Sequence, residues 1–208
     1  MDSMPEYWAQ ACAALARRDA VLKRMMRVQG DARLSSRGDA FGTLARSIVG
    51  QQISVKAAES VWARLAAGLG HKVRPQTVLA CDVDALRQFG LSQRKAQYLH
   101  DLATHFIEGD VRPRRWRAMD DEAIIAELTA VRGIGRWTAE MFLIFHLLRP
   151  NVFPLDDIGL LRGLSLAYAG GEPVSRSQAR EIADLWSPWA TVGTWYIWRS
   201  LDPLPVAY

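Results

Sequence analysis

The sequence has few of the residues that build metal clusters or disulfide frameworks. Among its 208 residues are two cysteines, Cys12 and Cys81, and four histidines. Two thiols cannot supply a four-thiolate iron–sulfur or zinc centre, and the histidines show no HExxH spacing. We therefore expect neither a structural metal cluster nor a disulfide scaffold.

Long apolar runs are also missing. The longest, Met141–Leu148, is interrupted by His146 and is shorter than the roughly 20 residues that cross a bilayer. The first residues include acids and lack an apolar block after a basic cluster, unlike a signal peptide. The sequence predicts a protein without a membrane span that acts in the cytoplasm, at the nucleoid if its source is bacterial.

No run of four to eight residues alternates between apolar and polar as in a half-buried strand. Apolar residues instead recur at spacings of three and four. This pattern predicts an all-α protein. Helix N-caps are expected at Ser54, Asp82, Ser92 and Asp120. A loop is expected over 165–175, followed by one helical stretch from about 177 to 200.

The composition is that of a folded chain, with 50% apolar and 23% charged residues. The formal net charge of +4 is a weak indication of a polyanionic partner. More specific information comes from two short motifs.

The first motif is a glycine turn between two apolar helical segments, in LTAVRGIGRWTAEMFLIF. The first helix is expected to stop at Gly133, and a second to start directly after Gly135. Glycines two apart permit a turn too tight for side chains. The amides of Gly133, Gly135 and Arg136 would then point outward at a helix N-terminus, where a phosphate can bind. A plain helix-to-helix turn is the alternative.

The second motif, FPLDD, brings two carboxylates to the start of another helix, twenty residues after Trp137. They belong to Asp156 and Asp157. Capping that helix is the structural alternative to a chemical role.

Together, GIGRWTAEM and FPLDD resemble the helix-hairpin-helix base-excision DNA glycosylases of the 3-methyladenine DNA glycosylase II, or alkylpurine, type. LARSIVGQQISVKAAESVW, GLSQRKAQYLHDLA and LWSPWATVGTWYIW resemble the family's early, middle and C-terminal helices. The resemblance covers roughly residues 41–198.

The resemblance implies one glycosylase domain over 1–208, built from two helical lobes with DNA in the cleft between them. One lobe, about 41–136, is barrel-like and ends in the hairpin. The other combines about 1–40 with 137–208. Because 208 residues leave no space for the extra N-terminal sheet domain of larger members, we expect a compact form of the family.

The resemblance also implies roles for single residues. Asp157 is the catalytic carboxylate and Asp156 its helix-capping neighbour. Trp137, Trp198 and Met141 line the base pocket, although Met141 replaces a tyrosine of the larger enzymes. The remaining DNA contacts fall to Arg132, Gly133, Gly135, Arg136 and Thr138 of the hairpin and to Gln51, Gln52 and Ser54.

Two further implications concern the ion and the plug. No cofactor is required, but main-chain carbonyls of Thr129, Val131 and Gly133 are expected to hold a structural Na⁺ or K⁺. Gln52 is the expected side chain that fills the space of the flipped base. The alternative is that Gln51 and Gln52 only cap or solvate the helix joint.

The implied reaction is hydrolysis of the bond between an alkylated purine and deoxyribose in duplex DNA, leaving an abasic site. N3-methyladenine and N7-methylguanine are positively charged, so they leave readily and are attracted to aromatic faces. Tryptophan at position 137 replaces the lysine of strand-cutting relatives, which implies no lyase activity.

Two other functions remain open at this stage. A non-catalytic hairpin protein that only binds DNA would need neither Asp157 nor the tryptophans. A glycosylase for deaminated or etheno purines would need a general acid, and the sequence offers no convincing one. The expected partner is double-stranded DNA with alkylated bases, bound by a monomer.

Overall fold

The structure is a computed structural model that describes residues 5–30, 33–36 and 38–201. The regular secondary structure in these ranges consists of helices and includes no strand, which confirms the predicted all-α class. None of the described helices is long and apolar enough to cross a membrane. The described residues divide into two compact units: unit 1 comprises 5–30, 33–36 and 143–201, and unit 2 comprises 38–142.

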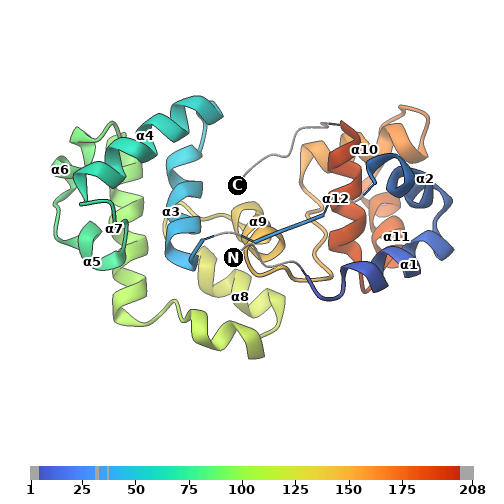
Figure 1. Cartoon of the computed structure of the whole chain (residues 1–208), viewed down its shortest axis with the longest axis horizontal. Helices are drawn as coiled ribbons and strands as arrows, with labels where there is room; N and C mark the ends of the chain where they lie inside the picture. Colours follow the sequence, from blue (N-terminus) through green and yellow to red (C-terminus); the bar gives the residue numbers. More distant parts are fainter. Residues whose placement is uncertain (1–4, 31–32, 37, 202–208) are drawn as a thin grey trace. The chain divides into compact units, whose positions relative to one another are not determined.

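Unit 2 is built around one long helix, α7 (Figure 1). Helices α3, α5 and α6 pack against α7, and α3 also packs against α4. Leu99 and Leu102 of α7 and Leu44 and Ile48 of α3 are fully buried. The elements of this unit are α3 (Ala40–Gly50), α4 (Val55–Gly68), α5 (Pro75–Leu79), α6 (Val83–Gln88), α7 (Gln93–Glu108), a 3₁₀ helix η1 (Pro113–Ala118), α8 (Asp121–Thr129) and most of α9 (Arg136–Phe145).

All four predicted N-caps of unit 2 are confirmed. The side chains of Ser54, Asp82, Ser92 and Asp120 each accept a hydrogen bond from the amide three residues later. The predicted stop at Gly133 is wrong, because α8 already ends at Thr129 and a turn fills the interval. Short polar caps are local signals, whereas the end of α8 depends on the turn that follows it.

Unit 1 is built around α12 (Ala190–Leu201), which packs against α1, α2, α10 and α11. The other four helices are α1 (Trp8–Arg18), α2 (Ala20–Gln29), α10 (Ile158–Tyr168) and α11 (Arg176–Trp186). The buried carboxylate of Asp19 caps α2 and accepts hydrogen bonds from Tyr168 Oη at 2.6 Å and Trp186 Nε1 at 2.9 Å. This side chain ties α2, α10 and α11 together.

Two predictions for the C-terminal third are corrected. The loop predicted for 165–175 starts only after Tyr168, because α10 continues to that residue. The single helix predicted for about 177–200 is two helices, α11 and α12, which are interrupted at Pro188. A proline lacks the amide proton that a helix interior needs.

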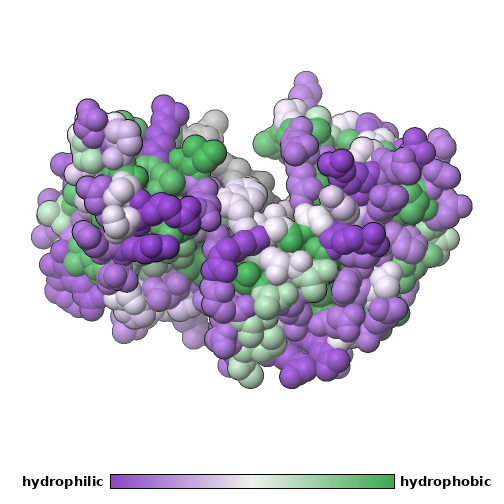
Figure 2. Space-filling view, turned by 180° about the vertical axis from the view of Figure 1, so that it is seen from behind, coloured by the Kyte–Doolittle hydropathy of each residue, from purple (hydrophilic) through white to green (hydrophobic). Residues whose placement is uncertain are grey.

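The two units meet along the chain within α9, after Phe142. The lobes implied by the resemblance divide at nearby positions, after about residue 40 and after about residue 136. On the face drawn in Figure 2, hydrophilic side chains predominate and hydrophobic ones are scattered among them. The large apolar side chains are concentrated in the cores.

Candidate active site

The hairpin of unit 2 contains two glycines, Gly133 and Gly135. The conformation of the free protein requires glycine at position 133 but not at position 135. Gly133 has a φ of +87°, and a Cβ there would collide with the ring of Tyr98 on α7. Gly135 has no positive φ, and a Cβ there would meet nothing within 4 Å. The open space at Gly135 is therefore available to a closely approaching partner.

Arg132 holds the hairpin onto α7 through Asp101. The Arg132 backbone amide donates to Asp101 Oδ2 at 2.8 Å, and its Nε and Nη2 each donate to Oδ1 at 3.0 Å. Burial raises the pKa of Asp101, but these hydrogen bonds outweigh burial, so that the pKa lies below its ordinary value. Arg132 thus has a structural role in addition to the predicted DNA contact.

Arg136, the first residue of α9, is engaged by two carboxylates. Its Nη1 donates to Glu122 Oε2 at 2.9 Å and its Nε to Glu140 Oε1 at 3.0 Å. The hydrogen bond with Glu122 raises the pKa of Arg136 and lowers that of Glu122. The cation at this position is therefore largely balanced within the unit.

The backbone of the hairpin remains the part suited to bind an anion. Amides of the first turn of a helix have no acceptor within that helix, and in α9 they belong to Arg136, Trp137 and Thr138. The side chain of Thr138 is only 8% exposed, so a DNA contact from this residue would come from its amide. Trp137 is 39% exposed, and Met141, one turn later, is 5% exposed.

The joint between α3 and α4 is tied to its surroundings at two points. Gln51 Nε2 donates to the Gly133 carbonyl at 2.8 Å, and Lys95 Nζ donates to the Val49 carbonyl at 2.7 Å. Burial lowers the pKa of Lys95. Gln52 is exposed and has a φ of +57°, a conformation that is uncommon for a residue with a side chain.

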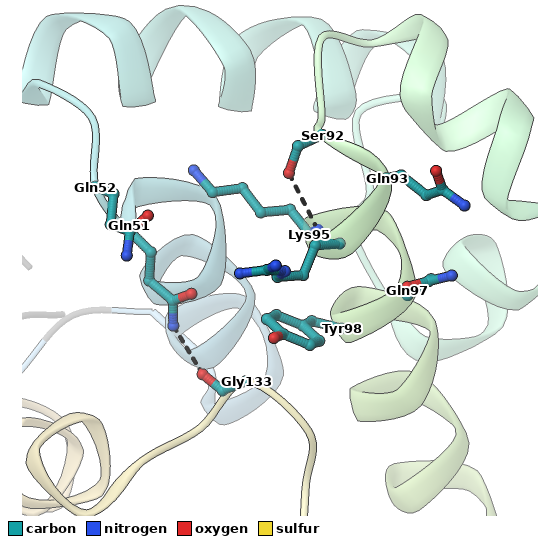
Figure 3. A pocket seen from close by; sticks show the side chains of 9 residues that line it. Gln51, Gln52, Ser92, Gln93, Lys95, Gln97, Tyr98 and Gly133 are labelled. Atoms are coloured by element: carbon teal, nitrogen blue, oxygen red, sulfur yellow. Dashed lines mark hydrogen bonds between the residues drawn. The ribbon is translucent and has the colours of Figure 1, made fainter.

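A polar hollow of about 660 Å³ opens beside this joint (Figure 3). Its walls come from the α3–α4 joint, the first two turns of α7 and the hairpin. Side-chain amides, two cations, one phenol, one hydroxyl and the backbone of one glycine line it. The lining residues are Gln51, Gln52, Ser92, Gln93, Arg94, Lys95, Gln97, Tyr98 and Gly133.

The three carbonyls expected to hold a monovalent cation are partly engaged. The Gly133 carbonyl accepts the Gln51 hydrogen bond, and the Val131 carbonyl accepts one from the Ile134 amide at 3.2 Å. A carbonyl oxygen has two lone pairs, so these oxygens can still ligate an ion. The amide of Gln51 would compete with such an ion at Gly133.

In unit 1, Asp157 is the N-cap of α10. Its Oδ1 accepts hydrogen bonds from the Leu160 amide at 2.6 Å and from Trp198 Nε1 at 2.9 Å. The expectation that Asp156 caps this helix is wrong, because Asp156 is exposed and pairs with Arg176 on α11. A cap must precede the first helical residue, and that position belongs to Asp157.

The predicted pocket aromatics are divided between the units. Trp137 and Met141 belong to unit 2, whereas Trp198 belongs to unit 1 with Asp157. The Trp198 ring stacks on Phe145 at a centroid distance of 5.8 Å and an interplanar angle of 15°. Three tryptophans lie within the single helical stretch predicted for about 177–200, and the structure separates them: Trp186 ends α11, Trp189 follows it and Trp195 lies on α12.

Several residues of these sites were not predicted from the sequence, and three of them act from a distant part of the chain. Asp101 and Lys95 hold the hairpin and the α3–α4 joint from α7, and Phe145 supports Trp198. Each acts across a long interval of sequence, and no short motif contains such pairs. The one indication of such contacts in the sequence is the presence of charged residues on α7 beside its apolar face.

Comparison with known proteins places these features in a family. Residues 45–188 match the HhH-GPD superfamily of base excision DNA repair proteins. The chain belongs to this superfamily. The matched region includes the hairpin, the α3–α4 joint and Asp157, and the family predicted from the two motifs is confirmed.

Individual relatives agree with this placement. A DNA-3-methyladenine glycosidase structure from Bacillus halodurans superposes with a TM-score of 0.87 at 31% identity, covering 92% of this chain and 89% of the other. The structure of Schizosaccharomyces pombe 3-methyladenine DNA glycosylase in complex with abasic DNA gives 0.79 at 27% identity, covering 95% and 100%. A Bacillus subtilis relative is 29% identical over 78% of this chain, which spans 59% of that relative's length.

Proposed function

We propose that this protein is a monofunctional DNA glycosylase that excises alkylated purines, N3-methyladenine and N7-methylguanine, from duplex DNA. It hydrolyses the bond between base and sugar and leaves an abasic site for base excision repair. The relatives named as 3-methyladenine DNA glycosylases support this substrate class.

The observation that carries the proposal is the position of Asp157. Its carboxylate stands at the start of α10, with one oxygen fixed by a backbone amide and an indole N–H. When the glycosidic bond breaks, positive charge develops on the sugar, and an ionised carboxylate nearby stabilises that charge. The purine leaves with the bonding electrons, which neutralise its positive charge, and water then adds to the sugar carbon and releases one proton to the solvent.

The substrate class fits the residues that surround this chemistry. An N-alkylated purine already carries a positive charge, so it leaves without protonation by a general acid. The rings of Trp137 and Trp198 are proposed to contact such a base, because an aromatic face attracts a cation. Residue 137 has no amine to form a Schiff base, so the phosphate backbone of DNA should remain uncut.

DNA is proposed to bind along unit 2 and to present the flipped nucleotide to Asp157 of unit 1. The amides at the start of α9 would bind a phosphate, with Gly135 allowing close approach. Gln52, held outward at the α3–α4 joint, would fill the space of the flipped nucleotide. The neighbouring hollow offers Arg94, Lys95 and several amides to the same strand region.

A Na⁺ or K⁺ bound by the hairpin carbonyls is proposed to stabilise the contact between the hairpin and DNA. The ion has no part in breaking the glycosidic bond. Replacing K⁺ by tetramethylammonium at constant ionic strength should weaken DNA binding if the ion is bound. A monomeric state and a cytoplasmic location stay predictions.

The two alternatives lead to different experimental results. A pure DNA-binding protein would bind duplex DNA without releasing bases. A glycosylase for deaminated or etheno purines would act on neutral lesions at least as fast as on methylated ones. We favour alkylated purines because relatives are named 3-methyladenine DNA glycosylases and because a cationic base leaves without a general acid.

The test is a gel assay with end-labelled, methylated duplex DNA. Wild-type protein should produce sites that break only after alkali treatment. Asp157→Asn should lower the rate about 10²- to 10³-fold, as for loss of one well-placed charged group. Asparagine is as good a cap as aspartate, so α10 should remain intact.

Asp156→Asn is the matched control, because it removes the neighbouring exposed charge and should keep near wild-type activity. Absence of alkali-labile sites with wild-type protein would contradict the enzymatic function. Strand breaks without alkali would contradict the monofunctional reaction.

A further inference from the structure

We propose that Trp198 is a positioning residue whose indole N–H orients the Asp157 carboxylate. This inference rests on the proposed function and deepens it. The resemblance assigned Trp198 only to the wall of the base pocket, through the face of its ring. In the structure, the edge of the ring donates a hydrogen bond to Asp157 through Nε1.

Two donors of different origin meet on one carboxylate oxygen. The Leu160 amide and Trp198 Nε1 lie 2.6 Å and 2.9 Å from Asp157 Oδ1. A backbone cap alone leaves the terminal torsion of an aspartate broad. The second donor, which comes from another helix, restricts that torsion and so fixes the plane of the carboxylate.

Trp198 is itself held in place. It lies on α12, a helix that packs against α10, and its ring stacks on Phe145 at the end of α9. The side chain that donates to Asp157 is thus supported from a third helix. A fixed donor needs no reorganisation when charge develops, which is what makes preorganised groups effective in catalysis.

Gly159 leaves the space that this hydrogen bond requires. A Cβ at position 159 would lie 3.2 Å from Asp157 Oδ1 and 3.7 Å from Trp198 Nε1. The first distance is tighter than ordinary contact, so a side chain here would press on the carboxylate. The Leu160 amide, the Trp198 indole and the absence of a side chain at Gly159 together set the orientation of the Asp157 carboxylate.

The decisive variant replaces Trp198 by its benzothiophene analogue, in which sulfur takes the place of the indole N–H. The ring face and volume are kept, so stacking on Phe145 and on a base should persist. We expect the single-turnover excision rate to fall about 10- to 100-fold, as for loss of a hydrogen bond to a charged group. Affinity for DNA containing an abasic-site analogue should stay within about twofold.

Trp198→Phe should reproduce the rate loss, and Trp195→Phe on the same helix is the matched control. Trp195 is buried and packs against Trp8 and Tyr196, so its replacement should reduce stability rather than the excision rate. The rate loss of the benzothiophene variant, which keeps the ring face, should be equal for cationic and neutral lesions. A role in base stacking alone would instead affect the cationic lesions most.

A double-mutant cycle separates this inference from the proposed function. In an Asp157→Asn background, replacing Trp198 should lower the residual rate no further, because the oriented charge is already gone. If wild-type protein is active and the benzothiophene variant excises bases equally fast, the positioning role alone is overturned. Fully additive rate losses in the double variant would overturn it as well. An inactive wild type would overturn the proposed function and this inference with it.

Discussion

The hairpin of unit 2 and the start of α10 in unit 1 are held in place by different kinds of interaction. In the hairpin, carboxylates engage the two cations: Asp101 binds Arg132, and Glu122 and Glu140 bind Arg136. At α10, a carboxylate receives two neutral donors, the Leu160 amide and the Trp198 indole. The first arrangement balances two cations and presents backbone amides, whereas in the second a backbone amide and an indole fix the direction of a carboxylate oxygen.

This difference matches what each region is proposed to do. A hairpin that binds any DNA sequence needs rigid amides, and specific side chains add little to contacts with phosphate. A group that stabilises a sugar cation needs its full negative charge and a fixed orientation. The predictions below test the two arrangements separately, from the largest expected effect to the smallest.

Gly133→Ala should destabilise unit 2 most. The new Cβ would occupy a left-handed conformation and collide with the ring of Tyr98. We expect the free energy of unfolding to fall by about 3 kcal/mol, measured by urea denaturation. A change below about 1 kcal/mol would contradict the tight contact between hairpin and α7.

Gly135→Ala is the matched variant, with little effect on stability and a clear effect on DNA. The added Cβ meets open space in the free protein. We expect unfolding to change by less than about 0.5 kcal/mol, as for ordinary surface substitutions. Duplex affinity, measured by fluorescence anisotropy, should fall about tenfold because the methyl group obstructs the approaching backbone. Unchanged affinity would remove Gly135 from the interface.

Asp101→Asn should loosen the hairpin by about 1 kcal/mol, allowing for the exposure of Arg132. Hydrogen exchange of the hairpin amides should report the loss, with Asp110→Asn as control. Because the folded-state pKa of Asp101 is lowered, its contribution is fully present above the unfolded pKa of about 3.9 and disappears as the pH falls through the folded value. The variant should lack this acid-dependent step.

Gln52→Gly should change stability and activity in opposite directions. Glycine adopts a φ of +57° without strain, so the protein should gain about 0.5 kcal/mol of stability. Excision should fall several-fold, because nothing then fills the space of the flipped base. Gln52→Ala, which keeps the strain but loses the amide, should slow excision equally without the gain in stability. If excision is unaffected by either variant, Gln52 is not the plug.

Local signals in the sequence predicted the all-α class, the four N-caps and both motifs, but not the end of α8 or the division between α11 and α12. Ser92 and Asp120 cap helices through contacts three residues away, so the pattern alone identifies them. The hydrogen bond between Trp198 and Asp157 spans 41 positions, and that between Arg132 and Asp101 spans 31. Such contacts depend on how helices pack, which a single sequence does not specify. Asp156 was misassigned because two adjacent carboxylates both satisfy a cap pattern, and only the helix start distinguishes them.

The central claim is that the charge of Asp157 stabilises a cationic sugar. The most direct test compares binding to duplexes that contain either a pyrrolidine nucleotide, whose protonated ring nitrogen imitates that cation, or a neutral tetrahydrofuran nucleotide. Wild-type protein should bind the cationic duplex about 100-fold more tightly, and Asp157→Asn should lose this preference. An equal preference in both proteins would contradict the account.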